Sequence, residues 1–289
     1  MIVASHRGPV SFQREDDGSF TTRRGAGGVV SALAPLLRNR PDTRWIAAAI
    51  GSDDCAAVTA GTPIASDIKV ELHLLDPELH RMHYDVISNR ILWFLFHGLF
   101  DLPREPSFGP ALHEAWDAFH AVNETFAEAI AQSAPENEVV LVQDLHLLLV
   151  PGLLHAVRPD LLISYFTHTP FCGPNAMRVL PDSISTELCA SLAATATGFH
   201  SPRWARAYEG STAEILGAGV DTAAFVSTFG PDPDELADVA AGPEVAAATA
   251  SLEDRIGDRR CIVRCDRVEL SKNIVRGFLA YDELLERHP

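Results

Sequence analysis

The stretch EVVLVQDLHLLLVPGLLHAVRPDLLISYFTH, residues 138–168, decides the fold class of this chain. An apolar run at 138–143 is followed by a helical pattern at 146–157 and by a second apolar run at 161–168. Short continuous apolar runs are typical of strands that are buried on both faces, and a helix between two of them is typical of parallel pairing. The stretch therefore predicts a strand–helix–strand unit of a parallel sheet.

The same alternation continues in both directions along the chain. Further strands are expected at residues 1–5, 44–50, 68–75, 196–201 and near 223–229, and further helices at about 27–37, 77–98, 111–132, 175–194 and from Pro202 onward. Pro35 is expected to kink or shorten the first of these helices. Residues 1–229 therefore predict a Rossmann-like α/β domain, a parallel sheet with helices on both faces.

A change in composition follows this predicted domain. The region 230–258 is rich in Pro, Asp and Ala and is expected to be a linker. CIVRC (261–265) predicts a single strand, with Cys261 and Cys265 buried on one face of it, and a helix follows. One strand and one helix cannot enclose a core of their own. We therefore expect 259–289 to be the start of a truncated domain.

The composition limits the partners of the chain. It has 289 residues, of which 39 are acidic and 23 basic, for a formal net charge of −16. Such an excess disfavours nucleic acid, which needs a basic surface. The start MIVASHRGPV lacks the features of a signal peptide, and no apolar run has the ~18 residues of a membrane span. We expect a cytoplasmic protein without a nucleic-acid or membrane partner, and leave open whether it forms a homo-oligomer.

Polar side chains follow three of the predicted strands. Arg7, Asp144 and His168 each come directly after an apolar run. Because the carboxyl ends of parallel strands meet at the ligand-binding edge of a sheet, these side chains are expected to lie close together. Arginine binds phosphate through a bidentate fork, and carboxylate and imidazole bind hydroxyl groups. Taken singly, each of these residues is more often a surface or capping residue; together they favour a phosphorylated polyol.

Two further segments have the character of a phosphate site. RRGAGGVV (23–30) places glycines directly before a helix, where free backbone N–H groups and the helix dipole favour an anion. Arg267 and Lys272 follow the predicted strand at 261–265. A structural glycine turn and a solvated helix start remain the alternatives. The cysteines are odd in number and widely spaced, so neither a disulfide framework nor a metal site is predicted.

Motifs spread over the whole chain resemble one family. They are VASHRGPVSF, GAGGVVSAL, SNRILWFLFH, VQDLHLLLVPGLL, YFTHTPFCGPNAMRVLP and CDRVELSKNIVRGFLAYDELLERHP. In this order they resemble the trehalose-6-phosphate synthase family, retaining glycosyltransferases of family 20, including the related pseudo-glycosyltransferases that make cyclitol phosphates. The resemblance implies the amino-terminal domain of a two-domain GT-B fold, with the second domain truncated.

The resemblance also implies an activity in trehalose biosynthesis and a role for each matching residue. Such enzymes transfer glucose from a nucleotide sugar, of the UDP- or GDP-glucose type, to glucose 6-phosphate, with no metal or other cofactor and no protein nucleophile. Implied at the transfer centre are His168 and Asp144. The implied acceptor-binding residues are Arg7, Tyr84, Trp93 and Asp144, and the implied donor-binding residues are Gly27, Gly28, His168, Arg267 and Lys272.

The chain departs from the family pattern at several positions. Ala48 stands where the family has a tryptophan that lines the acceptor pocket, and Asn175 stands where it has glutamate. A related acceptor, such as a cyclitol phosphate or glycerol phosphate, is therefore an alternative to glucose 6-phosphate. Residues 258–289 contain no match to the family's donor motif RDGMNLVxKE. We expect little or no transfer by this chain alone. The alternative functions are a non-catalytic sugar-phosphate-binding remnant and a pseudo-glycosyltransferase that joins a nucleotide-activated cyclitol to an aminocyclitol phosphate.

Overall fold

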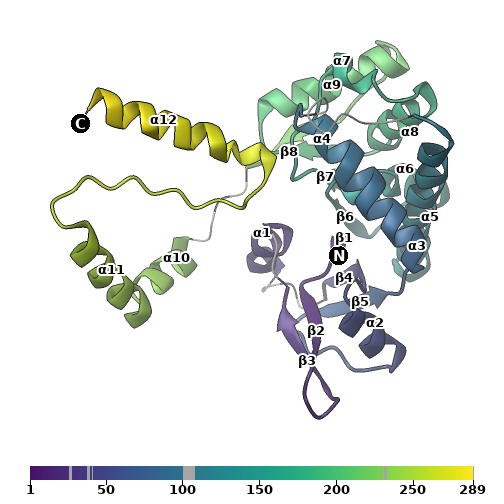
Figure 1. Cartoon of the computed structure of the whole chain (residues 1–289). Helices are drawn as coiled ribbons and strands as arrows, with labels where there is room; N and C mark the ends of the chain where they lie inside the picture. The colour runs from purple at the N-terminus through teal and green to yellow at the C-terminus, as the bar shows by residue number, and fades with distance from the viewer. Residues whose placement is uncertain are drawn as a thin grey trace. The chain divides into compact units, whose positions relative to one another are not determined.

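The computed structural model describes residues 1–25, 28–37, 40, 42–99, 108–228, 230 and 233–288. The chain divides into two compact units, Met1–Gly230 and Pro231–Pro289. Both are drawn in Figure 1. The predicted division of the region after 229 into a linker and a domain stays a prediction.

The first unit is built on a parallel sheet. Its seven strands are arranged in the order β5-β4-β1-β6-β7-β8-β9, and each pairs in parallel with its neighbours. This confirms the predicted sheet. The strands are β1 (Ile2–Arg7), β4 (Arg44–Ala48), β5 (Lys69–His73), β6 (Val139–Gln143), β7 (Leu162–Phe166), β8 (Ala196–Phe199) and β9 (Ala224–Val226).

Helices pack on both faces of this sheet (Figure 1). Successive side chains of a strand point to opposite faces, and both are apolar here. Val3 and Trp45 pack against helix α1 (Gly28–Leu37), which continues past Pro35, whereas Ile2 and Ile46 belong to the larger core on the opposite face. The other α-helices of the unit are α2 (Ser52–Thr59), α3 (Pro77–Arg81), α4 (Trp93–Phe96), α5 (Pro110–Ser133), α6 (Val150–Val157), α7 (Pro174–Met177), α8 (Asp182–Ala193) and α9 (Pro202–Leu216).

The helical stretch predicted for 77–98 contains an unexpected element. Between α3 and α4 the chain forms a π-helix, η1 (Met82–Leu92). Its wider turn brings residues five positions apart into contact, and Ser88 Oγ donates a hydrogen bond to the carbonyl oxygen of His83 over 2.8 Å. π-helical segments occur frequently at functional sites. Apolar periodicity alone does not distinguish this turn from an α-helix, and the sequence therefore did not predict it.

A β-hairpin lies between β1 and α1, where the sequence predicted only a glycine-rich turn. Strands β2 (Val10–Arg14) and β3 (Phe20–Arg24) pair antiparallel and extend away from the main sheet (Figure 1). Gly18, with φ +83°, provides the left-handed residue of the connecting loop. The backbone N–H of Phe12 donates to Asp54 Oδ1 over 2.6 Å, which anchors the hairpin to α2.

The second unit contains helices and extended chain. Its elements are α10 (Pro233–Ala240), α11 (Pro243–Ile256), η3 (Leu270–Lys272) and α12 (Ile274–Arg287). The strand predicted at 261–265 is wrong, and Cys261 and Cys265 are exposed rather than buried. A strand needs a neighbouring strand for its backbone hydrogen bonds, and the described residues of this unit form no other strand.

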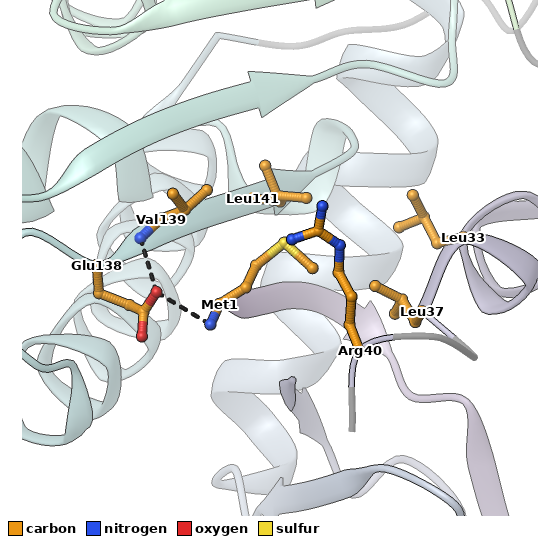
Figure 2. A pocket seen from close by; sticks show the side chains of 7 residues that line it. All are labelled: Met1, Leu33, Leu37, Arg40, Glu138, Val139 and Leu141. Carbon is orange, nitrogen blue, oxygen red and sulfur yellow. Dashed lines mark hydrogen bonds and ion pairs between the residues drawn. The ribbon is translucent and has the colours of Figure 1, made fainter. Parts of the chain in front are cut away.

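A groove of about 600 Å³ lies where β1 and β6 begin, at the amino edge of the sheet (Figure 2). Leu33 and Leu37 of α1 form one side of it. The α-amino group of Met1 pairs with Glu138 Oε1 over 3.0 Å, so the two charges satisfy each other. Ligands of parallel sheets bind at the opposite, carboxyl edge. We therefore place the candidate site at that edge. In the described part of the chain, no helix is long and apolar enough to cross a bilayer.

Candidate functional site

The carboxyl end of β6 places Asp144 in an uncommon backbone conformation. Its φ of 70° and ψ of 169° lie in a region that normally requires glycine. Two hydrogen bonds to the β7 side hold it there: the backbone N–H of Asp144 donates to the carbonyl of Phe166 over 2.8 Å, and Asp144 Oδ1 accepts from the backbone N–H of His168 over 3.2 Å. The two residues that the sequence placed at the transfer centre are therefore in direct contact.

The His168 side chain is oriented by the residue before Asp144. Its Nε2 lies 3.0 Å from Gln143 Oε1, which makes Nε2 the donor and Nδ1 the acceptor nitrogen of a neutral ring. Burial lowers the pKa of His168, and nearby His200 lowers it further, while the Asp144 carboxylate opposes both. A neutral imidazole beside a carboxylate can bind sugar hydroxyl groups without adding charge.

His200 belongs to the same edge and was not predicted. It follows β8 directly, and its ring centroid lies 5.4 Å from that of His168 and 5.0 Å from that of Phe166. Burial lowers the pKa of His200, against the influence of Asp144. The same rule that identified His168 would have identified His200, because both residues lie within two positions of the end of a buried strand.

Arg7 and Tyr84, predicted to hold the acceptor phosphate, lie together although they are far apart in the sequence. Arg7 ends β1, and Tyr84 lies in the π-helix η1. Arg7 Nη2 donates to Tyr84 Oη over 3.4 Å, and the guanidinium carbon lies 6.0 Å from the ring centroid of Tyr84. The arrangement leaves a cation and a phenol side by side at the sheet edge, which suits an anionic oxygen ligand.

A cluster of histidines lies behind this pair. His6 Nε2 is 2.9 Å from His80 Nε2, and the ring of His6 stacks on His146 at 4.8 Å and on Tyr84 at 4.9 Å. His83 Nε2 lies 2.8 Å from the carbonyl oxygen of His146. The sequence analysis gave these histidines no role. The spacing of His80, His83 and Tyr84 on one helix would have suggested a shared face.

The histidine cluster is held neutral. Burial lowers the pKa of His6 well below its ordinary value, and the neighbouring imidazoles and Arg7 lower it further. Burial also lowers the pKa of His146 and brings the pKa of His83 to about 3. Arg7 is therefore the permanent positive charge at this part of the edge. Among the described residues, no group of three or more His, Cys, Asp or Glu side chains is placed to hold a metal ion.

A cavity of about 430 Å³ adjoins Arg7 at the ends of β1 and β4. Ala48 and Gly51 line it, together with Asp54. Asp54 is committed to backbone groups, since its carboxylate accepts from Phe12 N and from Gly51 N. Because the side chain of Ala48 is small, the cavity leaves space beside the guanidinium group of Arg7.

Among the described residues, Trp93, which was predicted as an acceptor contact, does not join the pair of Arg7 and Tyr84. The ring of Trp93 stacks on His97 at 4.0 Å, and in the described part of the chain no hydrogen bond or ring contact joins it to Arg7 or Tyr84. Gly28 is the first residue of α1, and Gly27 lies outside the described residues.

Arg267 and Lys272 converge on one carboxylate within the second unit. Arg267 Nη2 lies 3.2 Å from Glu269 Oε2, and Lys272 Nζ lies 3.4 Å from Glu269 Oε1. Ser271 Oγ donates to the same carboxylate, and this bond is the largest cause that lowers the pKa of Glu269, ahead of the two cations. The side chain of Arg267 is 81% exposed, so it can reach a ligand in solution.

Comparison with known proteins identifies the family. The model of glycosyltransferase family 20 matches residues 1–289. The chain belongs to glycosyltransferase family 20. The resemblance noted in the sequence motifs is therefore confirmed, and the parallel sheet is the fold that the family implied.

The curated relatives of this family 20 chain are longer than it is. It is 31% identical to the UDP-forming alpha,alpha-trehalose-phosphate synthase of Schizosaccharomyces pombe, covering 100% of this chain and 58% of that protein. It is 32% identical to a trehalose-6-phosphate synthase of Mycobacterium sp. strain KMS, covering 99% and 60%. The chain thus spans about three fifths of the length of these relatives.

Solved structures share the fold of this family 20 chain. An E. coli trehalose-6-phosphate structure bound with UDP-2-fluoro glucose superimposes with a TM-score of 0.78 at 23% identity, over 100% of this chain and 61% of that one. The UDP-forming synthase of Burkholderia vietnamiensis gives 0.77 at 24%, over 100% and 60%. The amino-terminal domain of a Candida albicans trehalose-6-phosphate phosphatase gives 0.73 at 21%, over 89% and 54%.

Proposed function

We propose that this chain binds the sugar-phosphate acceptor in a retaining transfer of glucose from a nucleotide sugar, as in trehalose-6-phosphate synthesis. The observation that carries the proposal is the pairing of Arg7 with Tyr84 at the same sheet edge as Asp144 and His168. The acceptor phosphate binds Arg7 and Tyr84. Its hydroxyl groups donate to Asp144, and neutral His168 contacts the donor sugar.

The acceptor is glucose 6-phosphate or a related sugar or cyclitol phosphate. The curated relatives support the first choice, since they are named trehalose-phosphate synthases. Ala48 and the cavity beside Arg7 support a related acceptor of different shape, because the wall that a tryptophan would form is missing there. Glucose 6-phosphate is the first probe, and a cyclitol phosphate is the second.

The donor is a nucleotide sugar of the UDP-glucose type. The support comes from the UDP-forming relatives and from the E. coli structure with a bound UDP-sugar analogue. Arg267 and Lys272 are the proposed ligands of its pyrophosphate, where cations would stabilise the charge that develops on the leaving group. Gly27 and Gly28 are further proposed donor contacts, and Trp93 a further acceptor contact.

Calorimetry on residues 1–289 tests the acceptor proposal. Glucose 6-phosphate is expected to bind the unaltered chain, and Arg7→Ala is expected to weaken binding by about tenfold to a hundredfold, since a charge-assisted contact of about 1.5–3 kcal/mol is lost. Arg203→Ala is the matched control, because Arg203 lies in α9 and was assigned no role at the site. Equal affinity in Arg7→Ala and the unaltered chain would refute the site.

The second candidate is a non-catalytic sugar-phosphate-binding domain. The observation that favours it is the changed acceptor wall, where the small Ala48 lines the cavity beside Arg7. An assay with UDP-glucose and glucose 6-phosphate separates the two candidates. Because little or no transfer is expected of this chain alone, binding decides between them. UDP-glucose that binds the unaltered chain, and binds Arg267→Ala more weakly, supports the transferase. Glucose 6-phosphate that binds without any binding of UDP-glucose supports the binding domain.

A further inference from the structure

Two imidazole nitrogens face each other beside the proposed phosphate ligands. His6 Nε2 and His80 Nε2 lie 2.9 Å apart. The Tyr84 ring stacks on both imidazoles, with centroids 4.9 Å from that of His6 and 5.7 Å from that of His80. Arg7 donates to the hydroxyl of the same tyrosine. The histidine pair, the tyrosine and the arginine therefore form one contiguous group.

The contact between the two nitrogens limits the protons that the pair can hold. One Nε2 must carry a hydrogen and the other must offer its lone pair, since two N–H groups would repel each other. The pair therefore accepts at most one further proton without breaking. His6 is 2% exposed and its Nδ1 has no hydrogen-bond partner, whereas His80 is partly exposed. The further proton consequently resides on His80, because a charge on His6 would be buried.

The charges around the pair keep it neutral while the site is empty. Burial is the main cause that lowers the pKa of His80; Arg7 adds to this effect and Asp85 opposes it. His6 faces only cationic or neutral groups. The titratable and charged groups that face the pair, from β1, the helical segment η1 and the end of β6, are Arg7, His83, Tyr84, Asp85 and His146. Asp144 lies one step further away and acts on His146.

We propose that the His6–His80 pair takes up one proton from solvent when a phosphate monoester binds at Arg7, so that the acceptor site gains a second positive charge only when its ligand is present. This inference rests on the proposed function, in which Arg7 holds the acceptor phosphate. A phosphate monoester carries about −1.5 to −2 charges near pH 7, and one guanidinium balances only part of that charge. An imidazolium on His80 balances the rest.

This arrangement suits a chain with a formal net charge of −16. A pocket with two permanent positive charges would bind any anion. The His6–His80 pair becomes charged only when a dianion is bound at Arg7, so the site favours phosphate esters over monoanions and neutral sugars. His80 and His6 are therefore specificity residues that act through charge. Neither is required to touch the transferred sugar.

Calorimetry in buffers of different ionisation enthalpy tests the proposal. Glucose 6-phosphate and inorganic phosphate are titrated separately into residues 1–289 at about pH 7.5, where the ester is almost entirely dianionic. The slope of the binding enthalpy against the buffer ionisation enthalpy gives the number of protons taken up. We expect a slope equivalent to about one proton for the unaltered chain.

Two variants and a control make the result specific. His80→Gln keeps a polar side chain without a titrating ring; it is expected to abolish proton uptake and to weaken binding about tenfold. His6→Asn also keeps a polar side chain without a titrating ring. It is expected to reduce the uptake, and it tests the pair independently if His80→Gln folds poorly. His155→Gln is the matched control, since His155 is exposed on α6. Its slope should equal that of the unaltered chain.

Each outcome has a defined meaning. Binding of glucose 6-phosphate without proton uptake, or with equal uptake in His80→Gln and the unaltered chain, overturns the inference and leaves the proposed function standing. Inorganic phosphate that binds with proton uptake, while glucose 6-phosphate does not bind, supports the inference and overturns the choice of acceptor. Failure of both ligands to bind overturns the inference and the proposed acceptor site together.

Discussion

The backbone N–H of His168 donates to Asp144 Oδ1 over 3.2 Å, so a carboxylate joins the ends of β6 and β7. Asp144 makes this bond from a backbone conformation with φ of 70°, which glycine adopts most readily. A side chain that serves only packing would relax from such a conformation. The strain at Asp144 is therefore consistent with a carboxylate held in place for a ligand.

Substitutions at Asp144 separate the hydrogen bond from the backbone strain. Asp144→Ala loses the bond to His168 and keeps the strained φ, and is expected to lower the free energy of unfolding by about 1–3 kcal/mol. Asp144→Gly loses the same bond but relieves the strain, and should be more stable than Asp144→Ala by about 1 kcal/mol. Urea denaturation measures both. Equal stability of the two variants would show that the backbone is not strained.

The hydroxyl group of Tyr84 is expected to matter for binding and not for folding. In Tyr84→Phe the ring still stacks on His6, so the free energy of unfolding should change by no more than about 0.5 kcal/mol. The affinity for glucose 6-phosphate should fall about fivefold to tenfold, because one hydrogen bond to the ligand is lost. Tyr281→Phe, at a 48% exposed tyrosine of the second unit, is the control. An unchanged affinity in Tyr84→Phe would exclude its hydroxyl as a ligand.

His83 is expected to make the protein less stable in acid. Its pKa is about 3 in the folded chain against an ordinary value of 6.5, chiefly because the ring is buried. As the pH falls below 6.5, the unfolded chain binds a proton there that the folded chain does not bind, and stability is lost down to about pH 3. Between about pH 7.5 and 5 this loss amounts to about 2 kcal/mol.

The variant His83→Gln tests that assignment. This variant removes the titrating ring. The free energy of unfolding should therefore fall by about 2 kcal/mol less in His83→Gln than in the unaltered chain when the pH is lowered from about 7.5 to 5. Urea denaturation at the two pH values gives the difference. His155→Gln should retain the full dependence, since this histidine is exposed. The same dependence in His83→Gln and the unaltered chain would mean that other groups cause the acid sensitivity.

Four of the five cysteines are expected to fall into two classes of reactivity, whereas Cys55 is partly buried. Burial raises the pKa of Cys172 to about 12 and that of Cys189 to about 11, so neither thiol forms a thiolate readily. Cys261 and Cys265 are exposed. Native labelling with a thiol reagent should modify the exposed pair rapidly, and the variant with both changed to Ser should lose that rapid phase. Rapid native labelling of Cys172 would contradict its buried position.

Much of the fold could be predicted from periodicity alone. The strands β1, β6 and β7 are short apolar runs that alternate with helical patterns along the chain. This alternation is typical of a parallel sheet whose two faces are both covered by helices. The hairpin of β2 and β3 was missed because its strand residues are mostly polar, although Asp17-Gly18 in its loop is a turn signal. The strand predicted at 261–265 failed since nothing in the described part of its unit pairs with it.

The sequence by itself determined which polar residues stand at the ends of buried strands: Arg7, Asp144 and His168 follow from the alternation of strands and helices in a parallel sheet. Only the tertiary structure decided what lies beside them. His80 and Tyr84 come from the helical segment after β5, and its π-helical turn brings them against His6 and Arg7 of β1. Such contacts depend on how a helix is rotated against a sheet, and local periodicity does not specify that rotation.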